Sequence, residues 1–111
     1  MICDRFDTIV VPFPFSEVPV LTRRPAIVLS NARFNRDNGA TLVGMITTAK
    51  ASVWPSDHAI TDLAAAGLSV PCIVRWRLAT IPNTLIQRKL GRLAAIDRLS
   101  CERLLAEMVA R

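Results

Sequence analysis

Arginine is the residue type in this chain that is best suited to bind a phosphate. Twelve of the 14 basic residues are arginine, and the basic residues outnumber the nine acidic ones to give a formal net charge of +5. A guanidinium presents a planar fork of donors that fits a phosphate at two points, whereas a lysine ammonium acts as a point charge. A small basic domain of this composition is a candidate for nucleic-acid binding, although many small domains are basic without such a role.

The residue types argue against several other kinds of site. His58 is the only histidine, and beside Asp57 it is expected to be a surface or hydrogen-bonded histidine rather than a catalyst. Cys3, Cys72 and Cys101 form no C-x-x-C pair, which excludes a zinc finger and argues against a disulfide framework. Cys72 and Cys101 are expected to act as small core hydrophobes. Since the sequence has no Gly-rich phosphate loop, G-x-S-x-G turn or suitably spaced carboxylate pair, we expect neither a metal nor a cofactor.

Length and composition predict a single domain over residues 1–111. A chain of 111 residues buries enough surface to form a core without disulfide bonds or a structural metal ion. Its 51% of hydrophobic residues excludes disorder of the whole chain. No run approaches the roughly 18 apolar residues of a membrane span. Residues 1–5 lack the basic start and apolar stretch of a secretory signal. Together with the scattered thiols, these features predict a soluble, cytoplasmic protein.

Short apolar and β-branched runs, separated by proline, glycine and asparagine, predict a chain built mainly of strands. The expected strands cover residues 6–11, 25–30, 41–48, 58–60, 70–81 and 85–93. Residues 31–39 hold a cluster of turn formers and are expected to be a loop. Gly44, in the middle of the third strand, suggests a bulge or a close backbone approach.

Residues 94–110 predict the one substantial helix. Four apolar residues share a stripe at helical spacing: Cys101, Leu104, Leu105 and Met108. Ile96 and Leu99 fall off this stripe, so they either face a partner or are scattered exposed aliphatic residues. Five or six short strands must curl up or pack under the helix to bury a face, which predicts a mainly β fold, a small β barrel with a C-terminal helix.

The segment IVVPFPFSEVPVLTRRPAIVLS at residues 9–30 resembles the MazF/PemK family of toxin endoribonucleases from type II toxin–antitoxin systems. Further matches follow in the same order: Ile46-Thr47-Thr48, Val74-Arg75, KLGRL at residues 89–93, and the closing helix. The resemblance covers essentially the whole chain. It implies an SH3-like barrel of short antiparallel strands that forms a homodimer. It also implies sequence-selective cleavage of single-stranded RNA, with mRNA as the expected target, and inhibition by an acidic antitoxin protein.

The resemblance also assigns site residues. The family's arginine before the proline of the second strand matches Arg24, and the threonine that ends the third strand matches Thr47. Glu17, the only glutamate before the helix, is the candidate proton acceptor. The residues expected to bind RNA are Ser16, Thr22, Arg23, Thr48, Trp54, Arg75 and Arg77. Trp54 either stacks on a base or pins its own loop.

These assignments fit a metal-independent cleavage, in which the ribose 2′-OH attacks the adjacent phosphorus to leave a 2′,3′-cyclic phosphate and a 5′-OH. A fixed guanidinium stabilises the negative charge that builds up in the transition state, and a threonine hydroxyl fixes the attack geometry. Without the resemblance, Arg23 and Arg24 would be read as solvated charges beside a strand and Thr47 as an ordinary strand former.

Two departures from the family pattern leave alternatives open. The family often opens with Arg-Gly-Asp, whereas this chain has Arg5-Phe6-Asp7. Some PemK-like members carry an aspartate where this chain has Arg77, so the general base is not assigned. One alternative is a non-catalytic module of the same fold that binds RNA or antitoxin. A CcdB-like gyrase poison is disfavoured, because residues 108–111 read MVAR and lack that family's C-terminal Trp-Gly-Ile.

Overall fold

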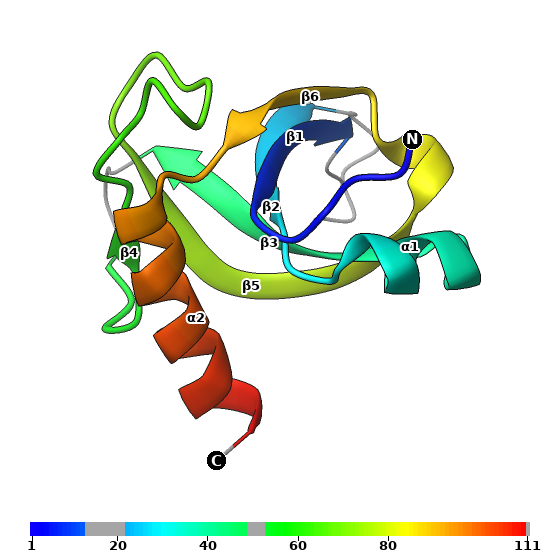
Figure 1. Cartoon of the computed structure of the whole chain (residues 1–111). Coiled ribbons are helices and arrows are strands. Elements are labelled where there is room, and N and C mark those ends of the chain that lie inside the picture. Colours follow the sequence, from blue (N-terminus) through cyan, green and yellow to red (C-terminus); the bar gives the residue numbers. More distant parts are fainter. Residues whose placement is uncertain (13–21, 49–52, 111) are drawn as a thin grey trace.

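The computed structural model describes residues 1–12, 22–48 and 53–110. Six antiparallel strands form one sheet in the order β4-β5-β3-β2-β1-β6. Their bounds are β1 Asp7–Pro12, β2 Arg23–Val28, β3 Ala40–Thr48, β4 His58–Ala59, β5 Cys72–Pro82 and β6 Arg88–Arg92. The sheet curls into a half-barrel (Figure 1), which confirms the expected mainly β fold with a C-terminal helix.

Three helical segments accompany the sheet: α1 (Ala32–Asn38), the 3-10 helix η1 (Asn83–Leu85) and α2 (Ala95–Val109). Figure 1 shows α1 and α2 on opposite sides of the view, with α2 extending away from the sheet toward the C-terminus. No helix among the described residues is both long and apolar enough to cross a membrane.

The expectation of a loop over residues 31–39 was wrong, because this segment contains α1. The Asn31 side chain caps the helix by accepting a hydrogen bond from the Phe34 backbone at 2.8 Å. Gly39 ends the helix in the left-handed conformation with φ 66°. The buried Asn35 amide donates to the carbonyls of Cys3 and Ser30 at 2.9 and 3.1 Å. Asparagine and glycine favour turns, but the same residues cap a short helix.

Two further predictions about β5 and β6 needed correction. The strand expected over residues 85–93 is confined to Arg88–Arg92, because residues 83–85 form η1. β5 begins at Cys72 rather than at Val70, although it continues to Pro82 as expected. The irregularity predicted at Gly44 is confirmed, since the β3–β5 register shifts between Gly44 and Met45.

Two hydrophobic clusters fill the core, and α2 packs on the larger one. Cys101 is fully buried there, with Leu104 and Leu105 against it, as the helical stripe predicts. Met108 is 43% exposed, so its placement on the buried stripe was wrong. Ile96 and Leu99 are exposed, which leaves both of their expected roles open. Cys72 belongs to the same cluster, which confirms both cysteines as core residues.

Phe6 explains how the chain tolerates its departure from the Arg-Gly-Asp opening of the resembling family. Its backbone has φ 70°, a conformation that costs a non-glycine residue free energy. The ring is 2% exposed and lies in the larger cluster, while the Phe6 N–H donates to the Val28 carbonyl at 2.6 Å. Burial of the ring and this hydrogen bond therefore hold the strained backbone in place.

Candidate functional site

A cavity of about 1000 Å³ opens where the ends of β2 and β3 meet β6 and a turn at residues 67–70. The ends of the two strands place five polar residues on its lining: Thr22, Arg23, Arg24, Thr47 and Thr48. Apolar side chains of the curled sheet, among them Val10, Pro25 and Ile46, line the same cavity. The cavity therefore combines polar donors with an apolar surface, as ligand sites usually do.

The strand register explains why Arg24 and Thr47 lie together. β2 and β3 are antiparallel, with Ala26 opposite Met45. Extending this register by two residues toward the cavity places Arg24 opposite Thr47. Residues that lie opposite each other on antiparallel strands project to the same face of a sheet. The last pair of the β2–β3 ladder is Ala26 with Met45, so Arg24 and Thr47 lie two positions beyond it, where both strands reach the cavity.

The opposite wall of the cavity is the contact between β6 and the turn at residues 67–70. The Arg92 N–H donates to the Ala65 carbonyl at 3.0 Å, and the buried Thr8 hydroxyl donates to the Ala66 carbonyl at 2.7 Å. Gly67 has φ 70°, and a Cβ atom there would clash with the Leu90 carbonyl. Only glycine therefore permits the turn to pack so closely on β6.

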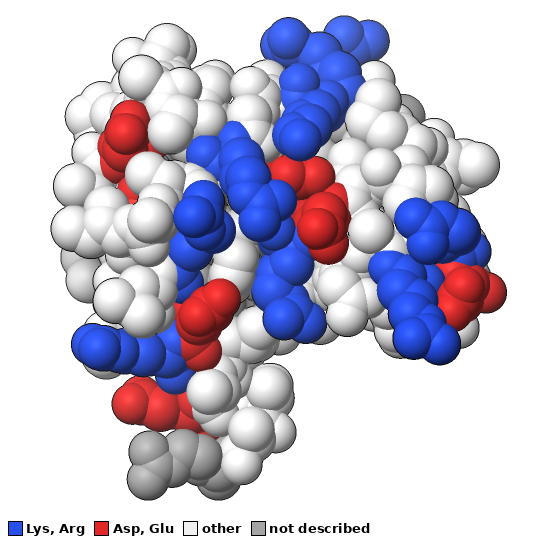
Figure 2. Space-filling model, viewed as in Figure 1, with Lys and Arg blue, Asp and Glu red and all other residues white. Residues whose placement is uncertain are grey.

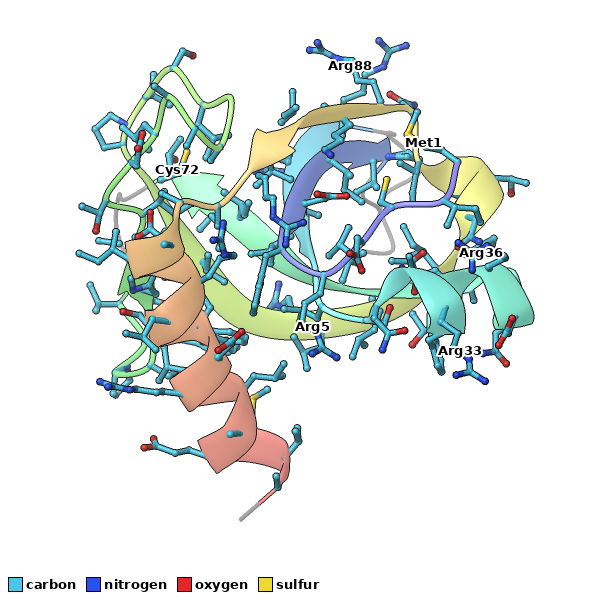
Figure 3. All side chains as sticks on the ribbon, in the orientation of Figure 1. Met1, Arg5, Arg33, Arg36, Cys72 and Arg88 are labelled. Carbon is cyan, nitrogen blue, oxygen red and sulfur yellow. The ribbon has the colours of Figure 1, made fainter. Side chains whose placement is uncertain are left out.

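Arg23, Arg24 and Arg88 give the cavity an uncompensated positive charge. Within the described part of the chain, none of the three has a carboxylate within 4 Å, and no acidic residue lines the cavity. Figure 3 shows Arg88 extending from β6 at the top of the view, and Cys72 beside the loop that holds residues 67–70. Unpaired guanidinium groups beside threonine hydroxyls form a site suited to an anion such as a phosphate.

Several other basic residues are paired with carboxylates outside the cavity. Lys89 and Arg92 contact the buried carboxylate of Asp7 at 3.2 and 3.4 Å. Arg75 holds both oxygens of Asp57, with Nε 3.2 Å from Oδ1 and a terminal nitrogen 2.9 Å from Oδ2. Figure 2 shows acidic side chains between the basic ones on the face that carries β6 and the N-terminal segment.

Arg75, Asp57 and Trp54 form one structural cluster. The Arg75 guanidinium carbon lies 5.5 Å from the centre of the Trp54 ring, and the Trp54 N–H donates to Asp57 Oδ2 at 2.9 Å. The hydrogen bond with Arg75 lowers the pKa of Asp57 and raises that of Arg75. These contacts fit the expectation that Trp54 pins its own loop.

The structure brings together some of the predicted site residues and separates others. The cavity gathers Thr22, Arg23, Arg24, Thr47 and Thr48. Trp54, Arg75 and Arg77 do not line it, and Arg77 is exposed on β5. Ser16 and Glu17 lie outside the described residues.

The sequence analysis did not single out the lining residues Gln87 and Arg88, nor the turn at residues 67–70. The one signal for Arg88 was the short polar run Gln87-Arg88-Lys89 inside a predicted strand.

The single histidine is tied to a buried carboxylate, as a hydrogen-bonded histidine was expected to be. His58 Nε2 lies 2.8 Å from Asp97 Oδ1, and the backbone N–H groups of Thr61 and Asp62 donate to Asp97 at 2.8 and 3.0 Å. Burial raises the pKa of Asp97, but these hydrogen bonds outweigh it, so the pKa lies below its usual value. This pair joins β4 to α2 and does not line the cavity.

The fold is similar to solved structures of bacterial toxins at low sequence identity. MazF (form I) from Deinococcus radiodurans superimposes with a TM-score of 0.77 and 16% identity, covering 100% of this chain and 99% of that chain. MazE-MazF (form III) from the same organism gives 0.76 and 17%, covering 99% and 98%. The Mycobacterium tuberculosis toxin MazF-mt6 gives 0.71 and 18%, covering 91% and 93%. At these identities the likeness concerns the fold alone.

Two comparisons of the sequence itself gave different outcomes. No significant match was found among curated protein sequences. Residues 4–109, in contrast, match the sequence profile of the family described as PemK-like, MazF-like toxin of type II toxin–antitoxin system. The chain therefore belongs to the PemK-like, MazF-like toxins of type II toxin–antitoxin systems.

Proposed function

We propose that this toxin is an endoribonuclease of the cytoplasm that cuts single-stranded RNA, with mRNA as its main target. The observation that carries the proposal is the cavity, in which Arg23, Arg24 and Arg88 have no described carboxylate partner and lie with the hydroxyls of Thr47 and Thr48. A similar structure from a mycobacterial species, with a TM-score of 0.73, is described as an endoribonuclease in complex with its cognate antitoxin.

The proposed reaction needs only groups that RNA, a protein and water supply. The ribose 2′-OH gives its proton to a base, for which Glu17 is proposed, and attacks the adjacent phosphorus, and the bond to the 5′-oxygen breaks as that oxygen takes up a proton from solvent water. The products carry a 2′,3′-cyclic phosphate and a 5′-OH. In the transition state the phosphorus is pentacoordinate and the group carries two negative charges. Cations held at the phosphate are therefore the main requirement.

Arg24 and Thr47 are the residues that we assign to the reacting phosphate. Arginine stays protonated at all working pH values, so Arg24 acts as a clamp on the developing charge and as the donor nearest the departing oxygen. The Thr47 hydroxyl donates a hydrogen bond to a phosphate oxygen and holds the attack geometry. Arg23 and Arg88 bind the flanking phosphates, and Glu17 is proposed as the proton acceptor.

Two partners belong to the proposal. An acidic antitoxin segment has the charge to bind the unpaired arginines and exclude RNA, and solved structures of related fold include MazE-MazF complexes. A second copy of the chain, forming a homodimer, is the other expected partner.

The test is incubation of the purified toxin with single-stranded RNA in the presence of EDTA. Cleavage that leaves cyclic phosphate ends in the wild type and is lost in Arg24→Ala supports the proposal. A second candidate, a module that binds RNA without cutting it, is favoured by Arg77, which stands where some resembling toxins have an aspartate. Tight binding that leaves the RNA intact would support the module and overturn the nuclease.

A further inference from the structure

The cavity is larger than a phosphate requires, and its two halves differ in chemistry. The half formed by the ends of β2 and β3 carries Arg23, Arg24 and the threonines assigned above, while Arg88 lies on β6 at the edge of the other half. The other half lies between the turn at residues 67–70 and β6, and its lining includes Leu68, Val70 and Leu90. A site that binds only the phosphates of RNA does not require these apolar residues.

Two exposed polar residues also line this half of the cavity. Ser69 and Gln87 line the cavity, and the side chain of neither forms a hydrogen bond with any described residue. The Gln87 amide offers one acceptor and two donors. An open surface that combines apolar residues with nearby donors and acceptors suits a flat heteroaromatic ligand whose edge carries donors and acceptors.

The backbone on both sides of this half is held in place before any ligand binds. The Gln87 N–H donates to the Val10 carbonyl at 2.9 Å, which fixes the start of β6 against β1. The Leu68 N–H donates to the Leu63 carbonyl at 2.9 Å, and Gly67 packs directly on Leu90. A group that distinguishes one base from another must be fixed within a fraction of an ångström, so this anchoring suits a role in recognition.

We infer that the half of the cavity between residues 67–70 and β6 holds one nucleobase of the RNA, and that Gln87 reads the edge of that base. The inference rests on the proposed function, because the base is delivered by the strand whose phosphates the arginines bind. Single-stranded RNA is recognised in this way, with unstacked bases inserted between apolar side chains and read by hydrogen bonds. Gln87 is thus proposed to set sequence preference, while Arg24 and Thr47 act on the phosphate.

The experiment compares cleavage by wild type, Gln87→Ala and Gln87→Glu on an RNA pool with randomised sequence, with the cut ends read by sequencing. Gln87→Ala is expected to reduce the preference at one position of the cut sequence by roughly tenfold to a hundredfold, while cleavage continues. Gln87→Glu keeps the shape but loses the amide donors, so it is expected to change which base is preferred at that same position.

Thr84→Ala is the matched control, because Thr84 is exposed on η1, three residues before Gln87, and does not line the cavity. Its cut sequence is expected to equal that of the wild type, and thermal melting confirms that all three variants fold. An unchanged preference in both Gln87 variants, with cleavage intact, would overturn the base pocket and leave the nuclease standing. Absence of RNA cleavage by the wild type would overturn both.

Discussion

Two regions of this small basic protein differ in whether their charged side chains are paired with an opposite charge. At the cavity, Arg23, Arg24 and Arg88 have no carboxylate within 4 Å among the described residues. Elsewhere, the carboxylates of Asp7, Asp57 and Asp97 lie within hydrogen-bonding or ion-pair distance of cations or a histidine. Net charge alone therefore does not locate a phosphate site. What distinguishes the cavity is that its positive charge is not already neutralised by the protein.

The fold separates the two kinds of charge through strand position. Arg23 and Arg24 begin β2 and Arg88 begins β6, so all three lie where the sheet opens. Asp7 begins β1 at the far end of the β1–β6 ladder, opposite Arg92. The same strand pair thus carries a neutralised charge at one end and a free one at the other. This arrangement predicts that variants of the first region lose activity and variants of the second lose stability.

The largest effect is expected from Arg24→Ala. Loss of one fixed donor to the transition state typically lowers the rate roughly 100- to 1000-fold, with little change in folding because Arg24 is exposed. Single-turnover RNA cleavage measures the rate. Arg92→Ala is the matched control, since it removes an arginine whose charge is paired with Asp7. Equal losses of rate in both variants would contradict the distinction between the two regions.

The next effect concerns the second region. Asp97→Asn is expected to lower the free energy of unfolding by roughly 1.5–3 kcal/mol, because it removes the buried charge that His58 and two backbone N–H groups bind and replaces one of the two acceptor oxygens with an NH2 donor. Urea denaturation measures the change. Asp37→Asn, in an exposed pair with Arg33, is expected to change stability by less than about 0.5 kcal/mol. An Asp97→Asn protein with the same free energy of unfolding as the wild type would contradict the structural role assigned to the paired charges.

A smaller part of the stability is expected to depend on pH. The pKa values of Asp57 and Asp97 lie below their usual values in the folded protein. A carboxyl group of this kind stabilises the fold above its unfolded pKa, about 3.9, and that contribution is lost as the pH falls through the folded pKa. The melting temperature should therefore be steady near neutral pH and decline below about pH 4. Asp97→Asn should show a shallower decline.

The smallest expected effect is on the salt dependence of RNA binding. Each phosphate contact contributes about 0.7 to the slope of log binding constant against log salt for a single strand. Arg23→Ala and Arg88→Ala should each reduce the slope by about this amount, while Lys89→Ala, whose ammonium contacts Asp7, should leave it unchanged. Binding is measured with an RNA that carries a 2′-deoxy sugar at the cut position, so that it is not consumed.

The elements with strong local patterns were predictable from the sequence, and those fixed by long-range pairing were not. The β-branched run at residues 41–48 predicted β3 to within one residue of Ala40–Thr48. α1 was missed because Asn31, Asn35 and Gly39 act through capping and burial, which a turn-forming composition does not reveal.

The same distinction holds for the candidate site. Arg24 and Thr47 could be named from the family resemblance, because each adjoins a recognisable strand end. Gln87 and Arg88 reach the cavity only because β6 pairs with β1, about 80 residues away along the chain, at Val10 and Arg88. No local signal in the sequence predicts that pairing, so the place of Gln87 and Arg88 at the cavity was not foreseen.

The pairing of β6 with β1 also has a consequence for synthesis of the toxin. The cavity takes residues from Val10 to Leu90, so a growing chain carries Arg24 and Thr47 long before it carries the wall that faces them. A chain interrupted before β6 leaves one edge of β1 bare and the cavity open on one side. The complete cavity therefore forms only after β6 (Arg88–Arg92) has been synthesised.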